Sequence, residues 1–124
     1  MIREPLVLVV DDDESVRDAF TLALVDESYR VVTADSGDVA VAAAKRERPD
    51  LVFLDLSMPG KDGVQTLVEL SALDPTIRVY IVTAFAEEYM ERLRAARQRG
   101  ISFQLASKPI TDEQIRMIAA ASLG

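Results

Sequence analysis

The chain contains no cysteine and no histidine among its 124 residues. Without cysteine it can form no disulfide bond and offers no thiolate for catalysis or metal binding. Without histidine it lacks the commonest general base and the commonest transition-metal ligand, and it cannot itself carry a phosphohistidine. These two absences exclude thiol-based and histidine-based chemistry from this chain.

Long hydrophobic segments and an excess of positive charge are also missing. No apolar stretch approaches the roughly 20 residues of a membrane-spanning helix, and residues 1–5 lead into too short an apolar run for a signal peptide. The net charge of −7 argues against nonspecific DNA binding. We expect a soluble, cytoplasmic domain over residues 1–124, with no membrane contact, no direct nucleic-acid binding and no second domain in this chain.

What the sequence does contain is a regular alternation of strand-length apolar runs with segments of helical period. The expected strands are 6–10, 29–33, 51–54, 77–82 and 101–106. Branched, continuous runs such as 6–10 are typical of strands buried on both faces. A helical segment follows each strand, and this pattern predicts five β-α units, with a parallel sheet covered by helices on both faces.

Local signals place the helices between these strands. Asp35 or Ser36 can cap a second helix that carries Val39, Ala40, Ala43 and Ala44 inward. The fourth helix is expected over 87–99, where Glu88 and Arg92 have the spacing of an i, i+4 ion pair. The last helix is capped by Thr111 or Asp112.

Polar residues stand at the end of four of the predicted strands. Asp11 and Asp12 follow the first strand, Asp55 the third, Thr83 the fourth and Lys108 the fifth. Because the carboxyl ends of parallel strands share one edge of a sheet, these side chains are expected to meet there, where such folds bind ligands.

Three carboxylates placed together would repel one another and raise at least one pKa. A hard divalent cation relieves this repulsion, and Mg²⁺ prefers oxygen ligands and retained waters. Each residue alone has an ordinary interpretation, as a helix cap, a strand terminus or a surface lysine. Together they supply carboxylates, a hydroxyl and an ammonium to phosphoryl oxygens, and indicate a magnesium-assisted phosphoryl acceptor.

These features together resemble the receiver domain of bacterial response regulators, over essentially the whole chain. The motifs that carry the resemblance are Val9-Val10-Asp11-Asp12, Asp55 with Met58-Pro59-Gly60, Thr83-Ala84 and Lys108-Pro109. The resemblance implies a flavodoxin-like α/β fold of three layers, with a five-stranded parallel sheet in the order 2-1-3-4-5. It also implies that the Lys108–Pro109 peptide bond is cis.

The resemblance further implies a signalling switch rather than an enzyme. Asp55 would receive a phosphoryl group from a sensor histidine kinase or a phosphotransfer protein, with Mg²⁺ as cofactor. The metal ligands would be Asp12, Asp55 and the backbone carbonyl of Ser57, with Asp11 acting through water. Thr83 and Lys108 would contact the phosphoryl oxygens.

The chain departs from the family on the face built from the fourth helix, fifth strand and fifth helix, which is expected to shift on phosphorylation. The family usually has Tyr or Phe three residues before the lysine, whereas this chain has Leu105. Phe103 lies two residues earlier and would share its strand face. Thr83, Leu105 and Phe103 are the candidate switch residues. The resemblance allows a phosphorylation-linked dimer and leaves the output partner and any attached effector unspecified.

Three other readings compete with a phosphorylated switch. A degenerate receiver would act as a protein-interaction module without phosphorylation, and it would have no reason to keep a magnesium site. An aspartate-nucleophile phosphatase usually needs a second acid two residues after the nucleophile, where this chain has Ser57. A flavodoxin-type flavin carrier needs a phosphate loop after the first strand, where the acidic residues 11–14 would repel phosphate.

Overall fold

Each strand of the structure runs parallel to its neighbours, because each is followed by a helix that returns the chain to the same edge of the sheet. The computed structural model describes residues 3–123. Its elements are β1 (Leu6–Val10), α1 (Glu14–Leu24), β2 (Arg30–Ala34), α2 (Gly37–Arg46), β3 (Leu51–Leu54), α3 (Gly63–Leu73), β4 (Arg78–Thr83), the 3-10 helix η1 (Ala86–Tyr89), α4 (Met90–Gln98), β5 (Gln104–Ser107) and α5 (Asp112–Leu123).

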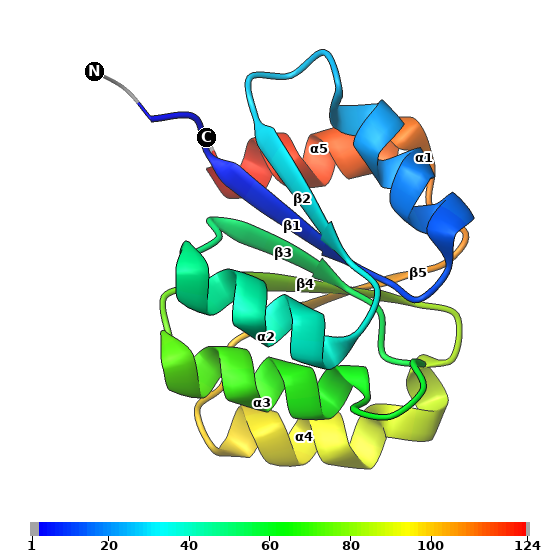
Figure 1. Ribbon diagram of the computed structural model, residues 1–124. Coiled ribbons are helices and arrows are strands. Elements are labelled where there is room, and N and C mark those ends of the chain that lie inside the picture. Colours follow the sequence, from blue (N-terminus) through cyan, green and yellow to red (C-terminus); the bar gives the residue numbers. More distant parts are fainter. Residues whose placement is uncertain (1–2, 124) are drawn as a thin grey trace.

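The sheet has five strands in the order β2-β1-β3-β4-β5, which confirms the predicted flavodoxin-like α/β fold. Helices α1 and α5 cover one face, and α2, α3 and α4 cover the other, so the molecule has three layers (Figure 1). The Lys108–Pro109 peptide bond is cis, as expected. No helix within residues 3–123 is long and apolar enough to cross a membrane.

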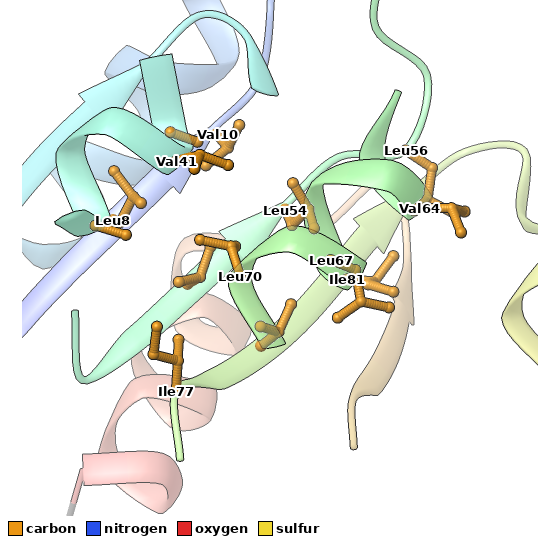
Figure 2. Close-up of a cluster of buried hydrophobic side chains, with 14 of the residues drawn as sticks. Leu8, Val10, Val41, Leu54, Leu56, Val64, Leu67, Leu70, Ile77 and Ile81 are labelled. Atoms are coloured by element: carbon orange, nitrogen blue, oxygen red, sulfur yellow. The ribbon is translucent and has the colours of Figure 1, made fainter. Parts of the chain in front are cut away.

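Two hydrophobic clusters hold these layers together, one on each face of the sheet. Alternate residues of β1 point to opposite sides, so Leu8 packs under α2 and α3 while Val9 packs under α1 and α5. In the first cluster, the side chains of Leu54, Leu67 and Ile81 are fully buried and pack together (Figure 2). The prediction that β1 is buried on both faces is therefore confirmed.

Side chains cap the helices at the positions where the sequence left alternatives. Ser36 caps α2 by accepting a hydrogen bond from the Val39 N–H at 3.2 Å. The Thr111 hydroxyl accepts from the Gln114 N–H at 3.1 Å and so starts α5. Each cap satisfies a backbone donor that the first helical turn leaves free.

Helix α2 presents a different stripe to the core from the predicted one. Val39 is exposed, whereas Val41 is buried beside Ala40 and Ala44. The stripe starts at Gly37, where an added Cβ would lie 2.2 Å from the Thr66 Oγ1 of α3. That close approach fixes which side of α2 meets α3, and the helical period then turns Val39 outward.

The fourth α-helix and the fifth strand begin later than the sequence predicts, at Met90 and Gln104. A turn of 3-10 helix precedes α4, and β5 begins at Gln104 instead of residue 101. Arg97 explains the second difference, because its guanidinium lies 4.3 Å from the centre of the Phe103 ring and its Nη2 donates to the Phe103 carbonyl at 3.1 Å. The Phe103 carbonyl is therefore bonded to a side chain, and the pairing of β5 with β4 starts one residue later, at Gln104.

Candidate functional site

The polar residues predicted at the strand ends lie together at the carboxyl edge of the sheet. Backbone hydrogen bonds continue past the strands: the Asp55 N–H donates to the Val10 carbonyl at 3.0 Å, and the Lys108 N–H to the Thr83 carbonyl at 3.0 Å. These bonds fix the positions from which the side chains project, so the sheet itself positions the site.

Three carboxylates form the centre of this edge. One oxygen from each of Asp11, Asp12 and Asp55 lies within 4.8 Å of the other two. Asp11 and Asp55 are buried, with 4% and 7% exposure, while Asp12 is exposed. Burial of like charges at this range is unfavourable unless a cation compensates it.

Lys108 supplies part of that compensation. Its Nζ lies 2.7 Å from Asp11 Oδ2 and 3.6 Å from Asp55 Oδ1. Burial by itself would lower the pKa of Lys108, but the hydrogen bond to Asp11 and the charge of Asp55 outweigh it, so the net effect raises this pKa. The ammonium therefore stays charged between the two buried carboxylates.

Asp11 and Asp12 differ in how their oxygens are engaged. Both carboxylate oxygens of Asp11 accept hydrogen bonds, one from Lys108 and the other from the Asp13 N–H at 3.0 Å. Among the residues that the structure describes, no group donates to the carboxylate of Asp12. The Asp11 carboxylate is thus engaged by the protein at both oxygens, whereas the oxygens of Asp12 are available to a further ligand.

Asp55 has a raised pKa for two reasons. Burial is the larger cause, and the charge of Asp11 adds to it; Lys108 and the N–H groups of Leu56 and Ser57 oppose the shift. Because the folded protein holds a proton on this carboxyl more tightly than the unfolded chain does, ionised Asp55 destabilises the folded state. This destabilisation is complete above the raised pKa and disappears as the pH falls below the unfolded value.

Replacing Asp55 by Asn is therefore expected to stabilise the metal-free protein at neutral pH. The gain in unfolding free energy should shrink as the pH falls toward about 4, the ordinary pKa of aspartate. Urea unfolding in a chelator, across that pH range, measures it. Asp35→Asn, at an exposed aspartate after β2, is the matched control. A variant less stable than the wild type at neutral pH would contradict the described electrostatics.

The other predicted site residues differ in how deeply they are buried and in what they contact. Thr83 is buried at the end of β4, and its Oγ1 accepts from the Phe85 N–H at 3.4 Å. Ser57 is exposed, two residues after Asp55. Leu105 is 38% exposed on β5, beside Ile81 in the register, while Phe103 packs against the core below Arg97.

Two residues that the sequence analysis did not single out contact the site. An added Cβ on Gly63 would lie 2.3 Å from the Asp55 carbonyl oxygen, so only glycine fits there. Arg17 donates from Nη1 to the Asp11 carbonyl at 2.9 Å. The Asp62–Gly63 pair at a helix start was a weak signal for the close contact at Gly63. No local pattern indicated the contact made by Arg17.

Ion pairs between distant segments hold the loop that follows Asp55. Lys61 Nζ lies 2.9 Å from Asp38 Oδ1 and 2.7 Å from Glu69 Oε1. Asp62, the N-cap of α3, receives two hydrogen bonds from Arg92, at 2.7 and 3.1 Å. Arg92 therefore pairs with Asp62 and not with Glu88, and the loop is tied to α2, α3 and α4.

A doubly wound α/β domain with an acidic cluster and a lysine at its carboxyl edge is the architecture of a signalling receiver. Residues 7–120 match the family described as the response regulator receiver domain, and the chain belongs to this family. It is therefore a receiver domain of two-component, phosphorelay signalling. The acidic cluster at its carboxyl edge is compatible with a Mg²⁺ site.

The chain is similar both to a known protein of about its own length and to much longer ones. It is 34% identical over 110 residues to sporulation initiation phosphotransferase F of Bacillus subtilis, covering 89% of this chain and 86% of that protein. It is 36% identical over 109 residues to the transcriptional regulatory protein GlrR of Escherichia coli, covering 88% of this chain and 24% of that protein. The chain thus spans about a quarter of this longer relative.

Solved structures agree with this assignment. The receiver domain of NtrX from Brucella abortus superposes with a TM-score of 0.79 at 31% identity, over 94% of this chain and 97% of that one. The chemotaxis protein CheY4 of Vibrio cholerae superposes with a TM-score of 0.82, over 97% of this chain and 99% of that one. At 24% identity, the second comparison bears on the fold alone.

Proposed function

We propose that this domain is a phospho-accepting switch in which Asp55 receives a phosphoryl group from a phosphohistidine on a partner kinase or phosphotransfer protein. The observation that carries the proposal is the buried Asp55 carboxylate within the three-carboxylate cluster, with the Lys108 ammonium 3.6 Å away. A buried acid that ionises at a cost, beside a fixed cation, suits a nucleophile for an electrophilic phosphorus.

The donor set fits Mg²⁺. All of the candidate ligands are hard oxygen atoms, close enough to share one small cation. Asp12 and Asp55 would hold the ion, with the Ser57 carbonyl, while Asp11 would orient a bound water. When bound, Mg²⁺ supplies positive charge to the phosphoryl oxygens.

The chain's own residues perform the transfer as follows. A carboxylate oxygen of Asp55 attacks phosphorus in line, the phosphorus–nitrogen bond of the donor histidine breaks, and its electron pair leaves with the imidazole. Lys108 neutralises the charge on the phosphoryl oxygens, and the Thr83 hydroxyl donates a hydrogen bond to one of them. Water later attacks the acyl phosphate, which releases inorganic phosphate and returns the Asp55 carboxylate.

An apolar groove beside the site would receive the donor. It has a volume of about 490 Å³ and lies between α1 and the start of α5. Its lining includes Val16, Phe20 and Ile110, together with Lys108 of the site. A helix that carries the phosphohistidine would place its apolar side here and its phosphoryl group over Asp55.

The response would pass through Thr83, which the new phosphoryl dianion would draw inward, and would shift the face formed by α4, β5 and α5. Phe103 is held by Arg97. Leu105, which is 38% exposed, has no aromatic ring that could change rotamer when Thr83 moves. The change that reports phosphorylation would therefore differ from the one made by an aromatic side chain at that position.

Intact mass after incubation with Mg²⁺ and a small acyl-phosphate donor tests the proposal without a kinase. The wild type is expected to gain one phosphoryl group, and Asp55→Asn is expected to gain none. Asp35→Asn, with an exposed carboxylate outside the cluster, is the control and should react like the wild type. Equal labelling of wild type and Asp55→Asn would contradict the assignment of Asp55.

A further inference from the structure

Arg17 places a guanidinium beside the acidic cluster from the second turn of α1. Its backbone N–H donates to the Asp13 carbonyl at 3.1 Å, which fixes its place in the helix. Its side chain is partly buried, and Nη1 donates to the Asp11 carbonyl oxygen at 2.9 Å. The guanidinium thus contacts the backbone of the cluster.

This choice of partner is unusual for an arginine next to carboxylates, since the pairing with a carboxylate is normally the stronger one. Within residues 3–123, Arg17 forms no ion pair at 4.0 Å or less. Lys108 is the cation that lies against Asp11 and Asp55. Arg17 therefore leaves the carboxylates of the cluster available to a metal ion.

The Asp11 carbonyl belongs to the peptide that carries Asp12. On the strand side, the Asp11 N–H donates to the Ala34 carbonyl at 3.1 Å, and on the helix side the Asp13 N–H donates to the Asp11 carboxylate. Arg17 holds the carbonyl between them. The bond from Arg17 thus acts on the Asp11–Asp12 peptide itself, and the other two bonds hold the peptides on either side of it, although the Asp12 side chain is exposed.

We propose that Arg17 is a positioning residue for the divalent cation, because its hydrogen bond to the Asp11 carbonyl sets the direction of the Asp12 carboxylate. This inference rests on the proposed magnesium site. Loss of the hydrogen bond would leave a carbonyl without its partner and allow the peptide to rotate. Residues that orient metal ligands in this way typically change metal affinity by about 10- to 100-fold when they are replaced.

Positioning and simple charge predict opposite effects, which makes the inference testable. If Arg17 acted only through its positive charge, its removal would strengthen the attraction of Mg²⁺ to the cluster. If it orients Asp12, its removal weakens Mg²⁺ binding in spite of the more favourable charge.

The experiment is calorimetric titration of the folded wild type and Arg17→Met with Mg²⁺ alone. The dissociation constant of the variant is expected to rise about tenfold, since the orientation of one ligand is lost. Arg94→Met, at an exposed arginine of α4 remote from the cluster, removes the same charge and is expected to bind like the wild type. Arg17→Lys, which keeps the charge, is expected to bind more weakly than the wild type and more tightly than Arg17→Met.

Equal or tighter binding by Arg17→Met would overturn the inference while leaving the magnesium site intact. If Arg17→Met does not fold, Arg17→Lys decides: unchanged affinity in that variant would show that charge alone matters. A wild type that binds no Mg²⁺ would contradict the proposed function itself, and the two failures are therefore distinguishable.

Discussion

Lys108→Met is expected to lower the unfolding free energy by about 3 kcal/mol in the presence of a chelator at neutral pH, since breaking a buried ion pair costs roughly 3–5 kcal/mol. Asp11 and Asp55 are almost fully buried, and the Lys108 ammonium is the side-chain cation between them. Its removal would leave two carboxylates facing each other without a neutralising charge, and methionine would keep most of the aliphatic packing.

Urea unfolding measures this loss, and two further conditions identify its cause. Saturating Mg²⁺ should restore part of the stability, because a second cation then occupies the cluster. A lower pH should also restore it, as the Asp55 carboxyl, whose pKa is raised by burial, becomes protonated. Lys45→Met, at an exposed lysine in the last turn of α2, is the matched control and should change little. A Lys108→Met protein as stable as the wild type in chelator would contradict the described ion pairs.

Gly63→Ala is expected to destabilise the protein by about 2–3 kcal/mol, although alanine is favoured over glycine within helices. The added Cβ would lie 2.3 Å from the Asp55 carbonyl oxygen and 2.5 Å from the Leu56 Cα. Both are backbone atoms of the segment that carries the candidate nucleophile, so neither can move without displacing the site. The steric cost therefore outweighs the gain in helix propensity.

Gly60→Ala separates this clash from ordinary backbone strain. Gly60 has a φ of +73°, but no atom lies within 4 Å of its added Cβ. Its replacement should cost about 1 kcal/mol through left-handed strain alone. Thermal and urea unfolding of the two variants provide the comparison. A neutral or stabilising Gly63→Ala would show that the contact between α3 and Asp55 is looser than described.

The sequence was sufficient to predict the fold and the membership of the central cluster, for a physical reason. Burial of β1 and β3 on both faces gives unmistakable apolar runs, and the topology then brings their carboxyl ends together. Asp11, Asp12, Asp55 and Lys108 could therefore be placed together without any knowledge of distances.

Features set by tertiary contacts could not be predicted in this way. Arg92 has the spacing to pair with Glu88, yet it reaches Asp62 in a different segment. The start of β5 depends on Arg97 packing over Phe103, and the exposure of Val39 depends on how closely Gly37 approaches α3. Two of these outcomes are decided by a partner far away in the sequence, and the third by a side chain that reaches across the turn between α4 and β5. Periodicity and local propensity do not register such contacts.

Phosphorylation of Asp55 is tested by the intact mass of the wild-type protein after incubation with a small acyl-phosphate donor, once with Mg²⁺ and once with a chelator. We expect a gain of one phosphoryl group with Mg²⁺, none with chelator, and attachment at Asp55 when the labelled protein is fragmented. No adduct under either condition, together with no binding of Mg²⁺, would contradict the account and leave a receiver fold that acts only by protein interaction.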